Sequence, residues 1–194
     1  MRHHLLRAAL AAALSIGAAV PALRAQASTV VLLVRHAEKA APSGDPVLSA
    51  AGETRARALA AALADARVDA VITTQLRRTA LTAAPLAEER RLVPIVVPVG
   101  RDTEAHARAV AAAVRARPAG EAVLVVGHSN TVPAIIAALG GPRLPEMCDT
   151  EYSTLFTLVL PPAGQPRLIR ASYGAADAPA PEECARAMSG SMRP

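Results

Sequence analysis

Aromatic residues and cysteines are scarce in this chain of 194 residues. It has one Phe, two Tyr and no Trp, so it lacks the aromatic platforms on which unpaired bases stack. It also has no tract of basic residues, and these two absences argue against nucleic acid as a partner. Cys148 and Cys184 are the two cysteines, too few and too far apart for a metal site of sulfur ligands. We therefore expect neither a metal nor a cofactor.

Long apolar runs are also missing, apart from one near the start. The chain opens with "MRHHLLRAALAAALSIGAAVPALRAQAS", in which basic residues precede an apolar stretch at Ala8–Val20 and small residues follow it. This order predicts a secretory signal peptide over residues 1–27, cleaved after Ala27. The apolar stretch is short for a membrane anchor. We expect residues 28–194 to be exported, to the periplasm or the extracellular space, without a membrane attachment after cleavage.

Cleavage would also remove most of the positive charge. Residues 1–27 contain three arginines and no acid, so the formal charge of +5 falls to +2. The remaining chain has the length of a single domain, with a loose tail predicted from about residue 175. In an oxidising compartment, a disulfide between Cys148 and Cys184 is more plausible than two free thiols.

Apolar runs and alanine-rich periodic segments alternate along the chain and predict strands and helices. Ser49 precedes one periodic segment and is the expected N-cap of its helix. The predicted strands cover 29–35, 68–74, 92–99, 121–127, 153–162 and 167–174. The predicted helices cover 50–66, 75–89, 103–117 and 131–141.

The first strands are apolar on both faces, which is typical of a parallel sheet covered by helices on two sides. Prolines in the 92–99 segment place that strand at a sheet edge. The last two strands are joined by a Pro/Gly turn and predict an antiparallel addition. The expected fold class is α/β: a three-layer sandwich with a mostly parallel sheet, helices on both faces and an antiparallel C-terminal addition.

Polar residues gather where three of the predicted strands end. Arg35 and His36 follow the first strand, Arg77 and Arg78 lie at the start of a helix, and His128 follows "VLVVG". Since ligands bind beyond the carboxyl ends of parallel strands, these side chains should meet at one sheet edge. Arginine forks and helix N-termini match phosphate oxygens, and neutral imidazole can attack phosphorus. The pattern therefore favours phosphoryl chemistry.

The segments "VRHAEKA", "TTQLRRTALTA" and "VVGHSNT" resemble, in order and spacing, the three signature segments of the histidine phosphatase superfamily, the phosphoglycerate mutase-like group. The resemblance runs from about Val30 to Gly174 and is nearest to the small bacterial branch that includes phosphohistidine phosphatases. It implies an α/β sandwich and a metal-independent phosphatase. The substrate would be a phosphomonoester or phosphoramidate, carried by a small molecule or a phosphohistidine-bearing protein.

Carried over by position, the resemblance makes His36 the residue that becomes phosphorylated, with Arg35 beside it on the phosphate. Arg78, which precedes Thr79 and Thr82, matches the second phosphate arginine better than Arg77. His128 is the second histidine of the pocket, catalytic and phosphate-binding. Three further residues are candidates for the pocket lining: Glu38, Ser129 and Asn130. For Glu38, a loop ion pair with Lys39 is the favoured alternative.

Two departures from the family pattern stand out. Ala37 replaces the common glycine after the first histidine, a small change. Ser129 stands where some members carry an acidic proton donor. The remaining candidates for the general acid are Asp102 and Glu104, near His106, although Asp102 is also an expected helix N-cap. Without an acid, substrates with good leaving groups are favoured.

Other classes of function remain as alternatives. "GHSNT" suggests a serine hydrolase with Ser129 as nucleophile, but no histidine follows it, as the α/β-hydrolase order requires. A zinc site from His36, Glu38, His106 and His128 lacks a recognised spacing. A non-catalytic phosphate-binding module on the same fold would not need a nucleophilic histidine. A phosphomutase is the further alternative among enzymes.

Overall fold

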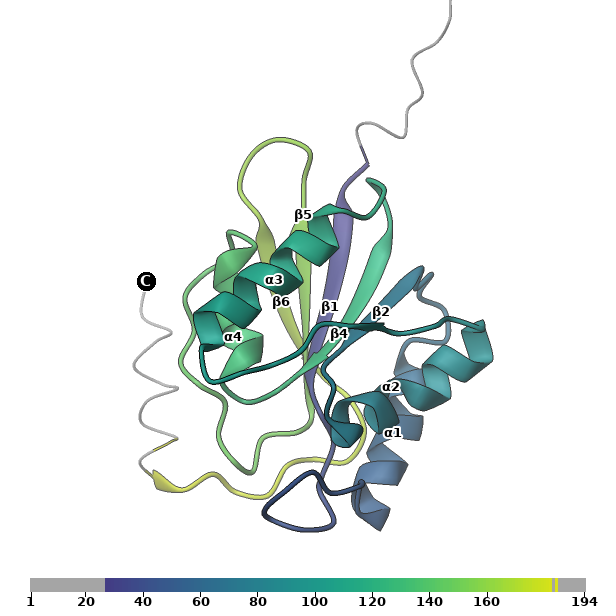
Figure 1. Ribbon diagram of the computed structural model, residues 1–194, viewed down its shortest axis with the longest axis vertical. Coiled ribbons are helices and arrows are strands. Elements are labelled where there is room, and N and C mark those ends of the chain that lie inside the picture. The colour runs from purple at the N-terminus through teal and green to yellow at the C-terminus, as the bar shows by residue number, and fades with distance from the viewer. Residues whose placement is uncertain (1–26, 183, 185–194) are drawn as a thin grey trace, which may run out of the picture.

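The computed structural model describes residues 27–182 and 184, which form one six-stranded sheet with helices on both faces (Figure 1). The strand order is β3-β2-β4-β1-β5-β6. The strands are β1 (Thr29–Arg35), β2 (Ala70–Thr73), β3 (Ile95–Val96), β4 (Ala122–Gly127), β5 (Thr154–Leu160) and β6 (Arg167–Ser172).

The sheet is mostly parallel, as predicted. β1 pairs in parallel with β4, β4 with β2, and β2 with β3. β5 adds antiparallel to the other side of β1, and β6 pairs antiparallel with β5. The Pro/Gly turn of the sequence thus joins a C-terminal hairpin, and β1 is the strand at which the sheet changes from parallel to antiparallel pairing.

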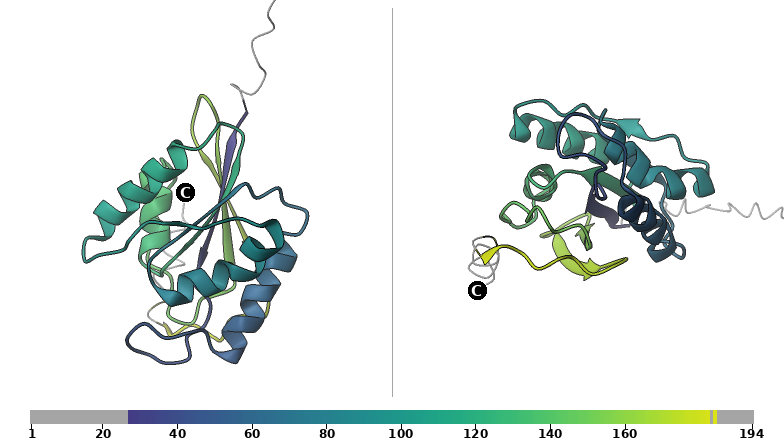
Figure 2. Two further views of the ribbon diagram at one scale, coloured as in Figure 1. Left: turned by 45° about the vertical axis from the view of Figure 1, so that its right-hand side comes forward. Right: turned by 90° about the horizontal axis from the view of Figure 1, so that it is seen from below.

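The four helices divide between the two faces of the sheet (Figures 1 and 2). They are α1 (Ala50–Ala62), α2 (Arg77–Arg90), α3 (Thr103–Arg115) and α4 (Thr131–Ala138). Val31 and Leu33 of β1 point into a core shared with α3 and α4, while Leu32 and Val34 point into a core shared with α1 and α2. This alternation follows from the period of two in a strand and confirms the three-layer sandwich.

Local sequence signals account for several element ends. Ser49 caps α1 by accepting a hydrogen bond from Gly52 N. β2 begins at Ala70, two residues later than predicted. The predicted 92–99 strand shortens to Ile95–Val96 at the sheet edge, because the prolines on either side lack the N–H that a ladder needs.

The start of the C-terminal tail, predicted to be loose from about residue 175, is anchored at Asp177. Asp177 accepts hydrogen bonds from the backbone N–H groups of Tyr152 and Ser153, each at 2.9 Å, and from the Ser153 hydroxyl at 2.8 Å. Cys184 forms the expected disulfide with Cys148. The tail therefore returns to the segment before β5, and two anchors hold that segment.

Residues 1–26 of the expected signal peptide lie outside the described residues. Within residues 27–182 and 184, no helix is both long and apolar enough to cross a membrane.

Candidate active site

The two histidines meet because their strands are neighbours. Arg35 at the end of β1 pairs in register with Gly127 at the end of β4, and His36 N donates to Gly127 O at 2.9 Å. The rings of His36 and His128 then lie edge to face, with centroids 5.3 Å apart. The sheet register thus brings together residues that are far apart in the sequence.

His36 presents one nitrogen as a nucleophile. Its Nδ1 lies 2.8 Å from Ala37 O, a carbonyl that can only accept, so Nδ1 carries the proton and Nε2 keeps its lone pair. Burial, followed by the charges of Arg35 and Arg78, outweighs the hydrogen bond to Ala37 and lowers the pKa of His36 from 6.5 to about 4. His36 is therefore neutral near pH 7, the form that can attack phosphorus.

His128 is also buried and neutral. Burial, and next the nearby His36 and Arg78, lower its pKa from 6.5 to about 3. Its Nε2 lies 3.3 Å from Thr74 Oγ1, whereas Nδ1 is buried without a hydrogen-bond partner among the described residues. A buried polar atom without a partner is costly, so this nitrogen indicates a ligand.

Arg35 is held from the segment before β5. Its Nη1 donates to the carbonyls of Cys148, Asp149 and Glu151 at 2.7, 3.1 and 3.2 Å. Its Cζ lies 4.2 Å from the centroid of the Tyr152 ring. Its Nε is buried and has no partner in the described structure. The backbone thus fixes one side of the guanidinium and leaves another for an acceptor.

Arg78, rather than Arg77, is the arginine of the site. Arg77 is exposed, whereas the Arg78 side chain is 16% exposed and contributes to the low pKa of both histidines. Its Nη1 lies 3.7 Å from Asp45, and its Nε is buried without a partner in the described part of the chain. Thr82 fixes this helix to the first motif: its hydroxyl donates to Arg78 O and accepts from Ala37 N.

Three buried nitrogens without partners in the described structure therefore come from the three motif segments, on residues that neighbour a neutral His36. They are Arg35 Nε, Arg78 Nε and His128 Nδ1. Two of them belong to cations, and α2 begins one residue before Arg78. Such an arrangement matches a phosphoryl group, whose oxygens accept several charge-assisted hydrogen bonds.

Glu38 does not form the loop ion pair with Lys39 that is common for such neighbours. It binds Arg55, with Oε1 2.8 Å from Nη2 and 2.9 Å from Nε, while Lys39 donates to Pro42 O. Arg55 is 5% exposed and also lies 3.8 Å from Asp177. It therefore connects the first motif to the C-terminal tail, a role that the sequence does not signal.

Ser129 and Asn130 lie at the start of α4. Ser129 O accepts from Met147 N, and the Asn130 side chain donates to Thr103 Oγ1 at 3.1 Å. These contacts tie α4 to its neighbours. The hydroxyl of Thr131, rather than either of these two residues, accepts from His128 N.

The two candidate acids lie away from the histidines' contacts. Asp102 caps α3 by accepting from Ala105 N at 2.9 Å. Glu104 lines a hollow between α3 and α4 together with Arg108 and Arg143. Among the described residues, neither carboxylate forms a hydrogen bond or ion pair with His36 or His128. Residues 27–182 and 184 also contain no group of three or more His, Cys, Asp or Glu arranged to hold a metal ion, so the four residues considered above do not form a zinc site.

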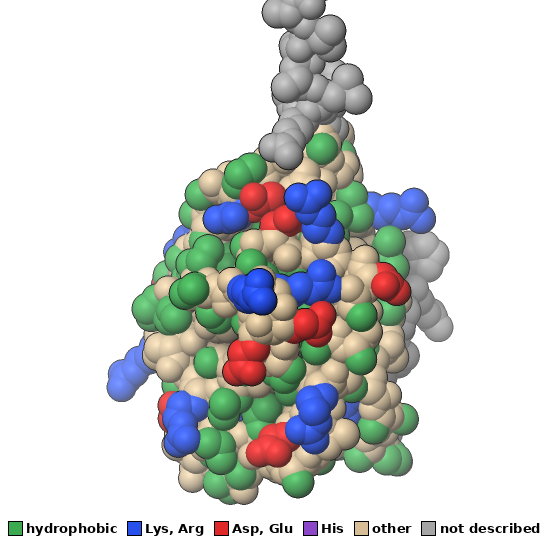
Figure 3. Space-filling view, turned by 90° about the vertical axis from the view of Figure 1, so that its right-hand side faces the viewer, with side chains coloured by type: hydrophobic (Ala, Val, Ile, Leu, Met, Phe, Trp, Pro, Cys, Tyr) green, Lys and Arg blue, Asp and Glu red, His purple; other side chains and the backbone are tan. Residues whose placement is uncertain are grey.

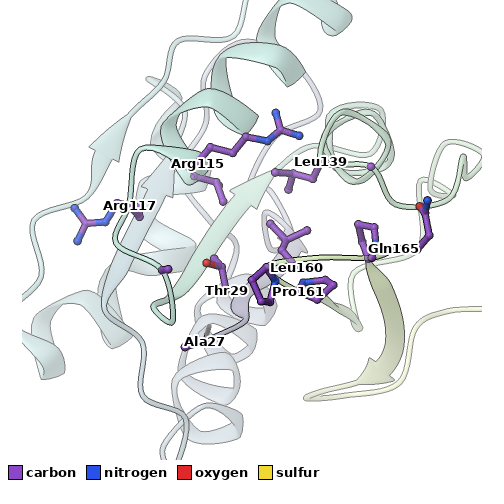
Figure 4. A pocket seen from close by; sticks show the side chains of 14 residues that line it. Ala27, Thr29, Arg115, Arg117, Leu139, Leu160, Pro161 and Gln165 are labelled. Atoms are coloured by element: carbon purple, nitrogen blue, oxygen red, sulfur yellow. The ribbon is translucent and has the colours of Figure 1, made fainter. Parts of the chain in front are cut away.

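Elsewhere, the surface has other features. A hollow of about 440 Å³ lies beside Thr29 and Pro161, at the end of β1 opposite Arg35, and no motif residue lines it. Figure 4 shows its lining side chains. On the face drawn in Figure 3, acidic and basic side chains are interspersed. The buried nitrogens of Arg35, Arg78 and His128 belong instead to the other end of β1.

A family model described as histidine phosphatase superfamily (branch 1) matches residues 31–101. No curated protein matches the chain. Among solved structures, mycobacterial hydrolase 2 is 19% identical with a TM-score of 0.59, and the alignment covers 84% of this chain and 98% of that one.

Two further structures are similar in the same way. The protein histidine phosphatase SixA, solved with tungstate, is 18% identical with a TM-score of 0.57, over 74% of this chain and 96% of that one. A mycobacterial glucosyl-3-phosphoglycerate phosphatase is 20% identical with a TM-score of 0.56, over 76% and 99%. Residues 31–101 thus match the histidine phosphatase superfamily model, and the fold of the chain is similar to that of these solved structures.

Proposed function

We propose that this protein is an exported phosphatase that works through a phosphohistidine on His36. The observation that carries the proposal is the set of three unpartnered buried nitrogens, on Arg35, Arg78 and His128, around a neutral imidazole. The match of residues 31–101 to the superfamily model supports a phosphatase-type activity.

The chemistry follows from the protonation state of His36. Its Nε2 lone pair attacks the phosphorus, an N–P bond forms, and the bond to the leaving oxygen or nitrogen breaks with its electron pair on the leaving group. Water then attacks the phosphorus and breaks the N–P bond, which releases inorganic phosphate and restores the imidazole. Arg35 and Arg78 offset the charge on the phosphoryl oxygens throughout, and neutral His128 contributes a hydrogen bond when its proton is on Nδ1.

The substrates we propose have leaving groups that depart without strong protonation, because Asp102 caps α3 and Glu104 lines a different hollow. Phosphoramidates such as phosphohistidine, acyl phosphates and aryl phosphates meet this condition. Of the two similar phosphatases, one is by name a protein histidine phosphatase and the other a glucosyl-3-phosphoglycerate phosphatase. Both a phosphohistidine-bearing protein and a small phosphorylated molecule therefore suit the proposal.

The test is hydrolysis of an aryl phosphate by purified protein. We expect His36→Ala to abolish turnover and Arg78→Ala to lower kcat by about 10²- to 10³-fold, the effect of losing one charge-stabilising donor. Arg77→Ala is the matched control, since its exposed side chain should leave kcat unchanged. An acid-labile phosphoprotein should be trapped from wild type but not from His36→Ala. Equal turnover by wild type and His36→Ala would refute the mechanism.

Two alternatives give different results in the same assay. A non-catalytic module would bind inorganic phosphate through the arginines but release no product from the aryl phosphate. A phosphomutase would transfer the phosphoryl group to an added alcohol in preference to water. Each outcome is read from the products.

Export has its own test. The disulfide between Cys148 and Cys184 suits an oxidising compartment, and the first residues of the sequence match a signal peptide. We expect the mature protein to begin at Ser28, which intact-mass measurement of the secreted form would show. A mass that retains residues 1–27 would exclude cleavage at Ala27.

A further inference from the structure

A hollow of about 450 Å³ adjoins the phosphate arginine. Its lining comes from residues 38–42, from Asp149 and Tyr152, and from Arg35 itself. Arg35 belongs both to this hollow and to the proposed phosphate site, so the two adjoin. This hollow is therefore the space next to a phosphoryl group at Arg35 that a leaving group can occupy.

The charges that line the hollow leave no net charge for a leaving group. Arg35 is engaged by the phosphoryl group, and Glu38 is paired with Arg55. What remains is one cation, Lys39, and one anion, Asp149, which lies 3.7 Å from Arg35 Nη2 and whose side chain is 97% exposed. Exposed charges of this kind contribute little to affinity because solvent screens them. A charged leaving group gains little here, so the lining favours a neutral one.

The rest of the lining is apolar and includes one aromatic ring. Ala40, Ala41 and Pro42 contribute from the loop after β1, and Tyr152 contributes from the segment before β5. The Tyr152 ring lies against Arg35 and has its centroid 6.3 Å from that of His36. An aromatic side chain offers a large rigid surface to a planar group. The shape therefore suits a flat substrate group beside the phosphoryl.

Tyr152 is fixed in place from the C-terminal tail. Its backbone N–H donates to Asp177 at 2.9 Å, and Asp177 lies 3.8 Å from Arg55. The disulfide at Cys148 fixes the same segment four residues earlier. Because this ring is ordered before any ligand binds, little conformational entropy is lost on contact.

We infer that this hollow is a subsite for a neutral, planar, aromatic-sized leaving group, and that Tyr152 determines this preference. The inference rests on the proposed phosphatase function, since it names the class of substrate for the same site. Asp177 acts as a positioning residue through its hydrogen bond to Tyr152.

The experiment compares the affinities of phenylphosphonate and methylphosphonate, measured by calorimetry. Both carry the same anionic head for Arg35 and Arg78, and neither can be hydrolysed, so the result does not depend on turnover. We expect wild type to prefer phenylphosphonate by about fivefold, within the range that aromatic pairs provide. Tyr152→Ala should lose this preference, which is compared as the ratio of the two affinities within each protein because Tyr152 also packs against Arg35. A cooperative thermal melt shows that the variant is folded.

Two conservative variants complete the set. Tyr152→Phe keeps the ring and should keep the preference. Tyr173→Phe is the matched control in the other tyrosine, which is buried away from the hollow. An equal preference in wild type and Tyr152→Ala, or none in wild type, would overturn the subsite. Failure of the phosphatase proposal shows separately, as absent turnover of an aryl phosphate by wild type.

Discussion

Stability should fall in mild acid because of the two buried histidines. His36 and His128 have pKa values of about 4 and about 3 in the folded protein, against 6.5 in the unfolded chain, with burial as the main cause. Below pH 6.5 the unfolded chain therefore takes up protons that the folded protein does not. The histidines lower stability progressively from pH 6.5 down to about pH 4 for His36 and about pH 3 for His128, and have almost no effect above pH 7.

The size of the effect follows from the same values. At pH 5 each unfolded histidine is about 1.5 pH units below its pKa, while its folded counterpart is still mostly neutral. One pKa unit corresponds to about 1.4 kcal/mol, so each histidine costs about 2 kcal/mol at pH 5 and the pair costs about 4 kcal/mol. Glutamine does not titrate, so the variant with both His36→Gln and His128→Gln should lack this loss.

The assay is denaturant unfolding at pH 7.5 and pH 5.0, for wild type, both single variants and the double variant. The buffers must be free of phosphate, because a ligand that binds the folded protein would stabilise it. The quantity compared is the change in unfolding free energy between the two pH values within each protein, which removes the direct effect of substitution. If the double variant loses as much stability as wild type, the histidines are not buried in neutral form and the proposed nucleophile is wrong.

Three other predictions concern the surroundings of the site. Cys148 and Cys184 are separated by 36 residues, so replacing both with Ser should lower the unfolding free energy by about 4 kcal/mol through loop entropy. The same change should raise KM, because the Cys148 carbonyl holds Arg35, the phosphate arginine. Gly52→Ala should destabilise the fold in thermal melts and lower activity, since its Cβ would lie against the Glu38 backbone carbonyl at less than contact distance. Tyr173→Phe should keep or raise the melting temperature, because its buried hydroxyl has no partner in the described structure.

The sheet and the central cluster could be predicted because their signals are local. Apolar runs on both strand faces predict a buried parallel sheet, and the polar residues at the ends of β1 and β4 follow directly. Arg35 and His128 are separated by most of the domain in sequence, yet both positions are set by where an apolar run stops. The parallel pairing of β1 with β4 is then sufficient to place these two residues close together.

The supports of the cluster could not be predicted in this way. Arg55 reaches Glu38 and Asp177 through side-chain contacts between α1, the first loop and the tail. The bonds from Arg35 go to backbone carbonyls, which every residue has, so no residue type marks Cys148 or Glu151 as an acceptor. Such contacts depend on the path of loops and leave no periodicity in the sequence. The tail was therefore predicted to be loose where Asp177 in fact anchors it.

The positions of Asp102 and Glu104 determine which leaving groups the site can release. A general acid needs a proton-bearing oxygen directed at the leaving group, yet the Asp102 carboxylate accepts a hydrogen bond at the start of α3, and Glu104 lines a different hollow. The cations at His36 favour bond formation to phosphorus but do not protonate the departing atom. Turnover should therefore depend steeply on the acidity of the leaving group. A series of substituted aryl phosphates measures this slope, and rates that are independent of the leaving group would require an acid other than these two.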